Sequence, residues 1–350
     1  MHHILVVNPG STTTKIALFA DETQVSGEVF CHDAAALRSC STLWDQLEPR
    51  WQAVHGWTSR HVREVSAVAA TGGLFRPVEG GTYAVNERML ADARANRQGQ
   101  HASNLGCALA QRLASAYGCP AFVVDPVSVD EFEPLARYSG HPLIPRRSLS
   151  HAISLHATAR RAARQLGVPL AASSMIIAHM GGGISVAPVR GGRIIDANDA
   201  SSDGPFSPER TGGLPLQPFM DLCFSGSYSE AQMRTLVMGG GGLLAYLGTN
   251  SAKEAEERIH AGDEAAREVY DAMAYQIAKE IGAMATVLAG RVDAVVLTGG
   301  LAASALLVNS VKKRVDFVAP VLVFPGEKEM SALAEGVLAV LRGEAPALEY

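Results

Sequence analysis

The chain has 350 residues, of which 47% are apolar and 19% charged, and its formal net charge is −5 at pH 7. This length suits two domains of ordinary size, and the apolar share is enough to bury a sizeable core. The slight negative charge gives no electrostatic reason to expect a nucleic acid or an anionic membrane as a partner. No apolar run approaches the roughly 20 residues that span a bilayer. The five cysteines include no Cys-x-x-Cys pair, which favours a reducing cytoplasm over a disulfide framework or a zinc site.

Strands and helices alternate in the N-terminal half. Four short apolar runs predict strands over residues 4–7, 15–19, 65–70 and 121–125. The first two flank a turn of Gly, Ser and Thr, which indicates a hairpin. Apolar residues at helical spacing predict a helix over residues 103–117, and Gly118 is a plausible stop.

The same alternation continues in the second half of the chain. The expected strands cover residues 175–179, 184–189, 194–196 and 292–297. Helices are predicted over residues 151–167, 263–290 and 329–342. Together the two halves predict an α/β protein.

The two halves also echo each other. An apolar strand, a polar residue and a glycine turn occur at residues 4–11 and again at 176–183. The polar residues, Asn8 and His179, are 171 positions apart (179 − 8), about half the chain. Such self-similarity indicates an internal duplication, although two unrelated hairpins would explain this one motif as well.

A run of small polar residues joins the first two expected strands: Asn8-Pro9-Gly10-Ser11-Thr12-Thr13-Thr14-Lys15. Its N–H groups, hydroxyls and one ammonium could surround a phosphate or a magnesium phosphate, because small residues let the backbone approach closely. It is not a P-loop, since Lys15 stands where the second glycine of that motif would be. Most such turns are only turns, so this loop alone leaves both interpretations open.

Two glycine loops follow expected strands in the second half: Gly181-Gly182-Gly183, with Ser185 close behind, and Thr298-Gly299-Gly300. Glycines at the carboxyl end of a buried strand let a flat ligand lie on the backbone, or merely let a helix pack closely. Three such loops together favour a phosphate or nucleotide site. The run Gly239–Gly242 follows no clear strand and is predicted to be a hinge or turn.

Six segments resemble the butyrate kinases of the acetokinase family, within the superfamily of acetate and sugar kinases, heat-shock chaperones and actin. They are NPGSTTTK (8–15), GLFRPVEGGTY (73–83), HASNLG (101–106), SGHPLIPRRS (139–148), GPFSPERTGGLP (204–215) and VVLTGG (295–300). They extend across nearly the whole chain, and the blocks around Arg76 and Arg210 are long and specific.

The resemblance implies a duplicated ribonuclease H-like (actin-like ATPase) fold, with two domains and a nucleotide cleft between them. The first domain would comprise residues 1–150 and 329–350, completed by the C-terminal helix, and the second residues 151–328. ATP or ADP would be bound by the three loops, through Asn8, Gly10, Ser11, Thr12, Lys15, His179, Gly181, Gly182, Gly183, Thr298, Gly299 and Gly300.

Similarity to the acetate kinases also implies individual roles. Two arginines would bind the substrate carboxylate and the phosphoryl group, a histidine would stabilise the transition state, and an aspartate would orient the metal. This catalytic set is Arg76, Arg210, His151 and Asp125. The set for Mg²⁺ or its waters is Asn8, Asp125 and Glu329, with Glu327 as the alternative to Glu329.

The chemistry of carboxylate phosphorylation suits these residue types. A carboxylic acid has a pKa near 4, so the nucleophile is already ionised at pH 7 and needs no general base. The difficulty is that one anion must approach another. Arginine reduces this repulsion, because its planar guanidinium can bind carboxylate and phosphoryl oxygens together and keeps its positive charge.

Each residue also has a structural alternative that would be preferred without the resemblance. Arg76 could pair with Glu79, and Arg210 with Glu209. His151 could simply begin a helix, and Asp125 could be a turn residue at the end of a strand. A zinc pair of His151 with His156 is set aside, since five helical steps place the two side chains on different faces.

Three positions depart from the family pattern. Ser150 stands where related kinases tend to carry Phe in the acyl pocket, which would enlarge or wet that pocket. Ser251 and Lys253 stand where relatives carry Asp and Arg in a segment that contacts the nucleotide. Nucleotide affinity or choice could therefore differ.

The resulting hypothesis is a cytoplasmic kinase that uses ATP and Mg²⁺ to phosphorylate butyrate or a short branched-chain fatty acid reversibly. An acetate or propionate kinase is the closer alternative, and a non-catalytic actin-like nucleotide switch is the more distant one. By the same resemblance we expect a homo-oligomer, a dimer or larger, with neither nucleic acid nor membrane as a partner.

Overall fold

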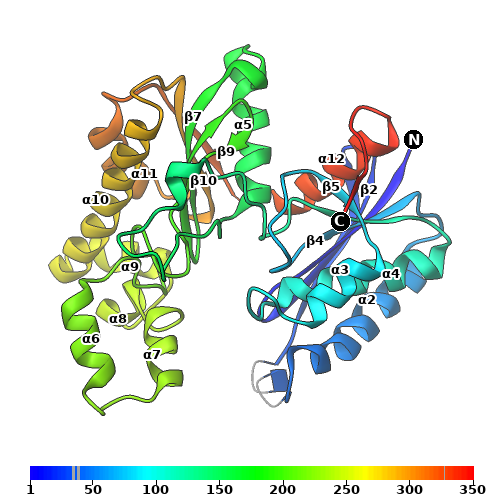
Figure 1. Ribbon diagram of the computed structural model, residues 1–350, viewed down its shortest axis with the longest axis horizontal. Coiled ribbons are helices and arrows are strands. Elements are labelled where there is room, and N and C mark those ends of the chain that lie inside the picture. The colour runs from blue at the N-terminus through cyan, green and yellow to red at the C-terminus, as the bar shows by residue number, and fades with distance from the viewer. Residues whose placement is uncertain (34–35, 38–39, 327) are drawn as a thin grey trace. The chain divides into compact units, whose positions relative to one another are not determined.

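The computed structural model describes residues 1–33, 36–37, 40–326 and 328–350. The chain forms two compact units (Figure 1). The first unit consists of Met1–Asp130 and Lys328–Tyr350, and the second of Glu131–Glu327. The N-terminal segment of the first unit thus ends at Asp130, whereas the domain division was expected at residue 150.

The first unit is built on a seven-stranded sheet in the order β12-β5-β6-β4-β1-β2-β3. Its strands are β1 (His3–Pro9), β2 (Thr13–Ala20), β3 (Thr23–Cys31), β4 (Ala67–Thr71), β5 (Thr82–Ala84), β6 (Ala121–Val124) and β12 (Leu348–Glu349). Strands β1, β2 and β3 form an antiparallel meander, whereas β4 and β6 run parallel to β1. The expected hairpin at the N-terminus is therefore present.

Helices cover both faces of this sheet (Figure 1). Leu5 and Val7 of β1 lie in one core with α4 (Gly106–Tyr117) and α2 (Leu47–His61). On the opposite face Val124 approaches Gly336 of α12 (Glu329–Leu341). Since side chains alternate along a strand, β1 and its parallel neighbour β4 are largely buried on both sides, and both are rich in apolar residues.

The second unit is built on a five-stranded sheet in the order β11-β10-β7-β8-β9. Its strands are β7 (Ser174–Met180), β8 (Ile184–Arg190), β9 (Arg193–Ile194), β10 (Ala294–Gly299) and β11 (Val321–Pro325). Strands β7, β8 and β9 are antiparallel, and β10 and β11 run parallel to β7.

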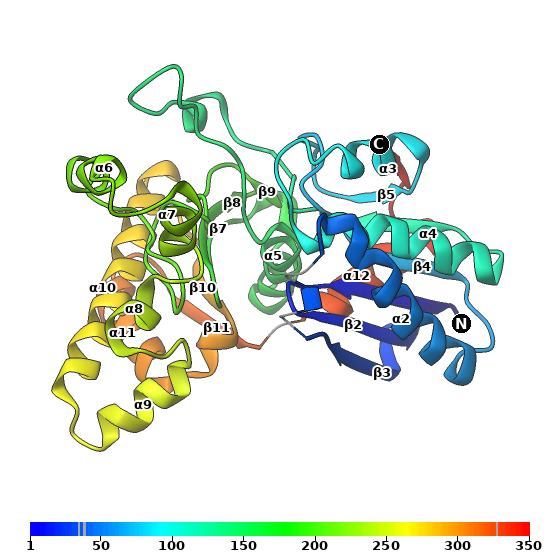
Figure 2. The ribbon, with the colours of Figure 1, turned by 90° about the horizontal axis from the view of Figure 1, so that it is seen from below.

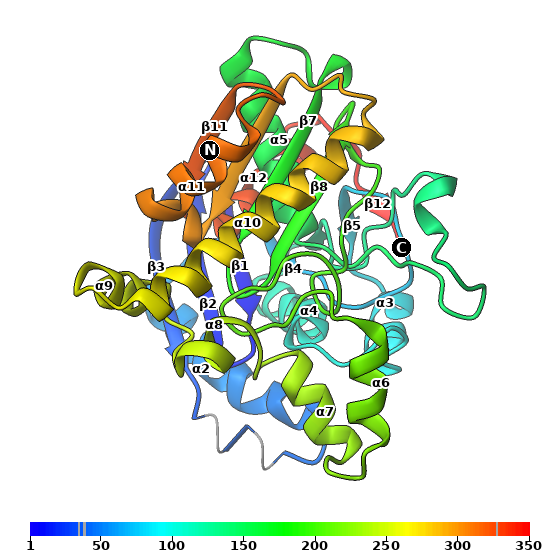
Figure 3. The ribbon, with the colours of Figure 1, turned by 90° about the vertical axis from the view of Figure 1, so that its left-hand side faces the viewer.

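The long helix α10 (Glu264–Val287) crosses one face of this sheet (Figure 3), and its buried side chains share a core with Ile176, Val186 and Leu297. The other face is covered by α5 (Ala152–Leu166), which packs on β7 and β10. Helix α5 ends as predicted at Gly167, whose φ of 68° suits a left-handed C-terminal cap.

The two sheets have the same core topology, since β1, β2, β3, β4 and β6 correspond in order and direction to β7, β8, β9, β10 and β11. The equivalence of Asn8 and His179, inferred from the sequence, agrees with this topology, because each is the next-to-last residue of the central strand before a hairpin. The helices α5 and α12 also correspond, since α5 follows β6 in the chain and packs on β7 and β10, whereas α12 follows β11 and packs on β1 and β4. The molecule is a duplicated α/β fold.

The remaining helices belong to the first unit (α3) or to the second (all the others). They are α3 (Glu87–Arg94), α6 (Leu216–Phe224), α7 (Glu230–Val237), α8 (Gly242–Leu247), α9 (Ala252–His260) and α11 (Ala305–Val315). Between β6 and α5 the chain makes a long excursion (Figure 2), in which Leu135, Tyr138 and Leu143 are exposed. No helix among the described residues has the length and apolar character needed to cross a membrane.

Candidate functional site

The first loop (residues 8–15) is a tight hairpin between β1 and β2, closed by a hydrogen bond from the Gly10 N–H to the Thr13 carbonyl oxygen at 2.8 Å. Asn8 and Lys15 are directly opposite each other in the β1–β2 register. Paired residues of neighbouring strands project to the same face, so the amide and the ammonium lie on the same face of the sheet. Ser11 and Thr12, at the tip, are exposed.

A buried arginine that sequence reasoning missed supports this loop. Arg50 of α2 is fully buried, and its guanidinium donates to the carbonyl oxygens of Thr13 at 2.8 Å and Ser11 at 3.1 Å. It also donates to Thr14 Oγ1 at 2.9 Å, and that hydroxyl lies 2.8 Å from His32 Nε2. Burial lowers the pKa of Arg50, yet a guanidinium remains charged at any physiological pH.

Two members of the predicted magnesium set are in contact. Asn8 Nδ2 donates to Glu329 Oε2 at 2.9 Å, which joins the end of β1 to the first turn of α12. The alternative residue, Glu327, lies outside the described residues. In the described part of the chain, no group of three or more His, Cys, Asp or Glu side chains is arranged to hold a metal ion.

The third member, Asp125, is held separately at the end of β6. Its carboxylate accepts the Gly81 N–H at 2.8 Å, and its own N–H donates to the Gly81 carbonyl oxygen. Asp125 is buried and has a φ of 40°, in the left-handed region that few non-glycine residues adopt. Backbone strain of this kind clusters at functional sites.

Arg76 pairs with Asp92 instead of Glu79, the partner considered from the sequence. Arg76 Nε lies 2.5 Å from Asp92 Oδ2, and Arg97 Nε lies 2.6 Å from Asp92 Oδ1. The Tyr350 hydroxyl donates to Asp92 at 3.0 Å and accepts the Arg76 N–H at 2.9 Å. Burial opposes ionisation of Asp92, but the bonds from the two arginines and Tyr350 outweigh it and hold its pKa below the usual value.

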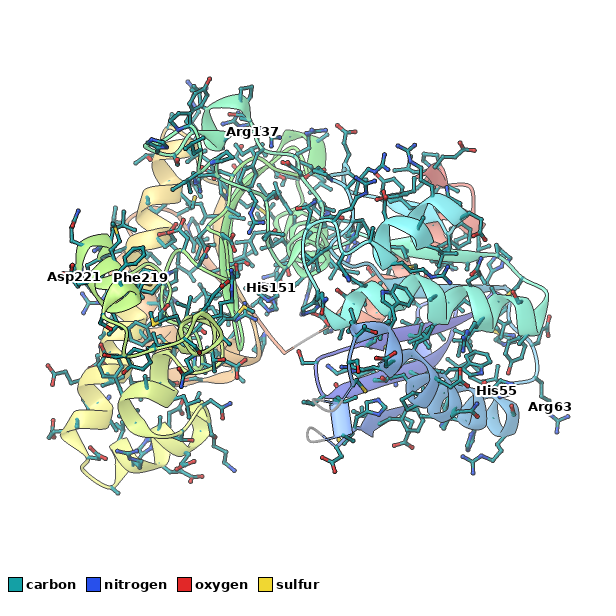
Figure 4. All side chains as sticks on the ribbon, turned by 60° about the horizontal axis from the view of Figure 1, so that its bottom comes forward. His55, Arg63, Arg137, His151, Phe219 and Asp221 are labelled. Atoms are coloured by element: carbon teal, nitrogen blue, oxygen red, sulfur yellow. The ribbon has the colours of Figure 1, made fainter. Side chains whose placement is uncertain are left out.

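In the second unit, two predicted histidines stack on each other. The ring centroids of His151, where α5 begins (Figure 4), and His179, in β7, are 4.1 Å apart. His151 Nδ1 lies 2.8 Å from Ser185 Oγ, and His179 Nδ1 lies 2.8 Å from Ser154 Oγ. These serines orient both rings beside the second loop, residues 181–183.

The second loop is packed against the Arg210 block (residues 204–215). Ser207 Oγ donates to the Gly182 carbonyl oxygen at 2.6 Å. A Cβ atom on Gly183 would lie 2.4 Å from Arg210 Nη1, so only glycine leaves room for this guanidinium.

Arg210 itself is half-buried, and Nη1 donates to the Ala200 carbonyl oxygen at 2.8 Å. Its buried Nε has no hydrogen-bond partner among the described residues. Burial lowers the pKa of Arg210, while the charges of Glu209 and Asp199 oppose that change. The result is a charged donor, with an unused N–H, held against a glycine loop.

The Gly239–Gly242 run supports the Arg210 block and forms a turn, one of the two roles considered for it. Gly239 and Gly241 donate backbone N–H groups to the Glu209 carbonyl oxygen at 2.8 and 3.2 Å. A Cβ on Gly242 would meet the Ser207 carbonyl oxygen at only 1.7 Å. These glycines are required by close backbone packing, which no local sequence signal reveals.

The third loop, residues 298–300, begins in the last two residues of β10. Thr298 Oγ1 donates to the Phe324 carbonyl oxygen at 2.9 Å, which ties the loop to β11. Gly299 has a φ of 89°, and a Cβ there would lie 2.4 Å from the Met180 carbonyl oxygen. Gly300 is exposed, with nothing near its Cβ position. Packing therefore explains Gly299, whereas Gly300 offers open backbone.

The positions that depart from the family pattern have distinct surroundings. Ser150 is buried, and its hydroxyl has no hydrogen-bond partner in the described part of the chain. Ser251 caps α9 by accepting the Glu254 N–H at 3.2 Å. Lys253 is exposed and lies 3.8 Å from Glu257.

Two units of one topology, each with a loop at the end of its central strand, define a duplicated ribonuclease H-like fold of the kind found in acetate and sugar kinases. Known structures agree. A crystal structure of Porphyromonas gingivalis acetate kinase superimposes with a TM-score of 0.80 at 18% identity, covering 97% of this chain and 100% of that one. A propionate kinase from Francisella tularensis subsp. tularensis gives 0.75 at 17% identity, covering 96% and 99%.

The chain belongs to the acetokinase family, whose family model matches residues 136–320. It is 48% identical to a "Probable butyrate kinase 2" of Caldanaerobacter subterraneus subsp. tengcongensis, over 98% of both chains. It is 45% identical to a "Probable butyrate kinase" of Listeria innocua, again over 98% of both. The predicted family and kinase class are thus confirmed.

Proposed function

We propose that this protein transfers the γ-phosphate of ATP reversibly to butyrate or a short branched-chain fatty acid, giving an acyl phosphate and ADP. The proposal is carried by Arg210, a charged and half-buried guanidinium held against the second loop by Gly183. Full-length similarity to probable butyrate kinases supports the choice of acid.

In the proposed reaction a carboxylate oxygen forms a bond to the γ-phosphorus, and the bond from that phosphorus to the β–γ bridging oxygen breaks. No proton needs to move, since the acid is ionised at pH 7. Arg210 balances the charge of the transferring group, because a buried guanidinium interacts more strongly with an anion than an exposed one does. Arg76, oriented by Asp92, binds the substrate carboxylate.

The remaining residues bind and orient. His151 donates a hydrogen bond to the phosphoryl group, with its ring fixed by Ser185 and by stacking on His179. Open backbone at Gly300 approaches the nucleotide, and the first loop binds its phosphates.

Asn8 and Glu329 fit a magnesium site, because their side chains are in contact and each carries a hard oxygen donor of the kind that Mg²⁺ prefers. Mg²⁺, when bound, neutralises phosphate oxygens. Few protein ligands are needed, since Mg²⁺ retains several waters. Asp125 would orient those waters through its carboxylate.

A hydroxamate assay for acyl phosphate tests the function, with acetate, propionate, butyrate and isobutyrate as substrates. We expect most product with butyrate or isobutyrate. Product mainly from acetate or propionate would favour an acetate or propionate kinase, and no product from any acid would leave the nucleotide switch. The Arg210→Ala variant should lose activity, whereas Arg234→Ala, which removes an exposed arginine paired with Glu230, should not.

The buried hydroxyl of Ser150 bears on the choice of acid. A small polar residue beside His151 leaves more room than an aromatic ring would, which favours longer or branched acids. The Ser150→Phe variant should shift the preference toward acetate. An unchanged profile would remove Ser150 from the acyl pocket.

We further propose that the protein works in the cytoplasm as a homo-oligomer. The five cysteines are free thiols, which suits a reducing compartment. Helix α6 buries none of its residues, and its Leu216 and Phe224 are exposed. Apolar surface of this kind favours an interface between copies, which sedimentation of the wild type and of Phe224→Asp would test.

A further inference from the structure

We infer that Arg50 is a positioning residue for the nucleotide, acting through the first loop without touching the ligand. This inference rests on the proposed function only in taking the first loop as a phosphate site. Arg50 lies in α2, outside every segment that carried the family resemblance, and no proposed role involves it.

The burial of Arg50 calls for a reason. A guanidinium taken out of water costs several kcal/mol unless hydrogen bonds and charges compensate, and arginine is rarely fully buried. In the described part of the chain no carboxylate forms an ion pair with Arg50. Its hydrogen bonds go to Ser11 O, Thr13 O, Thr14 Oγ1 and Gln46 Oε1. Three of these four acceptors belong to the first loop.

These bonds fix which way the loop peptides face. The Ser11 carbonyl oxygen accepts from Arg50 Nη2, and no peptide bond among the described residues is cis. In a trans peptide the N–H points opposite to the carbonyl, so the Thr12 N–H points away from Arg50. The Thr12 carbonyl oxygen accepts the His32 N–H at 2.8 Å, which fixes the next peptide as well.

The same guanidinium supplies charge behind the loop. Because Arg50 has no ion-pair partner in the described residues, its positive charge is balanced only by neutral dipoles. A fixed positive charge behind exposed N–H groups raises the affinity of the loop for an anion, and burial keeps that field from being screened. Arg50 therefore both orients the donors and favours an anionic ligand in front of them.

The ligand class that this arrangement favours is a nucleoside di- or triphosphate, bound through its phosphates at the first loop. The acid substrate has no phosphate, so its binding should not depend on Arg50. A role in folding alone would lower stability and leave nucleotide affinity unchanged in whatever protein folds.

The test uses Arg50→Lys, which keeps the charge but cannot bridge Ser11 and Thr13 with a planar fork. Titration calorimetry with Mg·ADP should give a Kd about tenfold higher than wild type, the effect of losing roughly one charge-assisted hydrogen bond. The KM for butyrate should change by no more than about twofold. Arg63→Lys, at an exposed arginine just after α2 (Figure 4), is the matched control and should behave as wild type.

Two further variants keep the test decisive. Arg50→Met removes charge and fork together and should weaken nucleotide binding more than Arg50→Lys does. If Arg50→Met does not fold, Thr14→Val still tests the loop, because it deletes the hydroxyl between Arg50 and His32 and should raise the Kd by about threefold. Folded Arg50→Lys protein with wild-type Kd for Mg·ADP, whatever its melting temperature, overturns the inference.

The outcome separates this inference from the proposed function. Wild-type protein that binds Mg·ADP but makes no acyl phosphate, with binding weakened in Arg50→Lys, would sustain the inference and refute the function. Wild-type protein that makes acyl phosphate, with Arg50→Lys unaffected, would do the opposite.

Discussion

The first and second loops occupy the same position in two copies of one fold, yet they are held in different ways. The first loop contains its own cation, Lys15, and is fixed from behind by the buried Arg50. The second loop contains only glycines, and its cation, Arg210, reaches it from a separate block. Duplication thus preserved the strand topology and the location of the loop, whereas the source of charge diverged.

Helices α5 and α12 also differ between the two units, in the side chain that each presents to the central strand. In each unit the next-to-last residue of the central strand has a polar side chain that contacts the first turn of a helix, α12 in the first unit and α5 in the second. In the first unit this contact is Asn8 to Glu329, and in the second His179 to Ser154. The first pair brings a carboxylate, whose charge attracts a cation, and the second brings a neutral hydroxyl that already bonds a histidine ring. We therefore expect metal dependence to reside in the first unit.

The largest effect should come from removing the external cation of the second loop. Arg210→Met should lower kcat by on the order of 10³-fold, the low end for an arginine that stabilises a transferring phosphoryl group. Mg·ADP affinity, which we attribute to the first loop, should change little. The hydroxamate assay and calorimetry measure the two quantities, with Arg234→Met as the control. A weakened Kd with unchanged kcat would mean that Arg210 binds nucleotide and does not act in transfer.

The second largest effect should come from a methyl group added to the second loop, compared with one added to the first loop. Gly183→Ala puts a Cβ 2.4 Å from Arg210 Nη1, so the guanidinium must move. Since misplacing a catalytic group by about 1 Å can cost roughly 100-fold, we expect a loss of that order in kcat/KM. Gly10→Ala meets Thr13 Oγ1 at 3.1 Å, and a small movement of that hydroxyl relieves the contact.

Gly10→Ala should therefore reduce kcat/KM by only about threefold. Neither Gly10 nor Gly183 has a positive φ, so replacing either by alanine adds no backbone strain that could explain a difference in activity. Melting temperatures near wild type for both variants would show that activity, and not folding, is being compared. Equal losses in the two variants would contradict a difference in how the loops use their glycines.

Much of the fold was predictable because the central strands β1 and β7, and β10 beside β7, are buried on both faces. Residues 4–7, 175–179 and 292–297 are mostly apolar runs bounded by turns, interrupted only by His179 and Asp293, and each lies within an observed strand or overlaps one closely. Strand β3 (Thr23–Cys31) was missed because it lies at the sheet edge and is largely exposed, which leaves no apolar pattern. Helix α2 was missed because Pro49 and Gly56 interrupt a weak amphipathic pattern.

The candidate site was predictable only where resemblance supplied it. The loops show as runs of Gly, Ser and Thr, but Arg50 is one arginine among the 30 Lys and Arg residues of the chain. Its burial depends on α2 packing under a hairpin some 36 residues away in sequence. The contact of Asp92 with Arg76 and Tyr350 likewise joins residues distant in sequence. Local patterns do not encode such contacts.

The Mg²⁺ dependence of activity tests the difference between α12, which carries Glu329, and α5, which carries Ser154 at the corresponding contact. Glu329→Gln keeps an acceptor for Asn8 Nδ2 but removes the negative charge. We expect the Mg²⁺ concentration needed for half-maximal activity to rise by about tenfold, since carboxylate charge dominates Mg²⁺ affinity. Ser154→Ala, the counterpart in α5, should leave that concentration unchanged. Activity titrated against free Mg²⁺ distinguishes the two, and an equal shift in both variants would remove the metal from the first unit.

The smallest effect should appear in two buried aspartates, one in each unit, whose pKa values move in opposite directions. The pKa of Asp92 is lowered, because bonds from Arg76, Arg97 and Tyr350 outweigh burial. The pKa of Asp196 is raised, because burial outweighs its 2.8 Å contact with Arg146. An acid with a lowered folded-state pKa stabilises the protein above its unfolded pKa and loses that contribution as pH falls through the folded value. A raised pKa has the reverse sign, so ionisation of Asp196 costs stability as pH rises.

Asp92→Asn should therefore lower the free energy of unfolding by about 1 kcal/mol at pH 7, where the carboxylate is fully charged. This difference from wild type should shrink below pH 3.8, the ordinary value for the group, as the wild-type carboxyl is protonated. Asp196→Asn should not show a loss that fades with acid, since its ionised form is already disfavoured in the fold. Urea unfolding at pH 7, 5 and 3, with each unit followed by hydrogen exchange, measures both. A loss in Asp92→Asn that persists undiminished at the lowest pH would assign its effect to packing and not to the charge that orients Arg76.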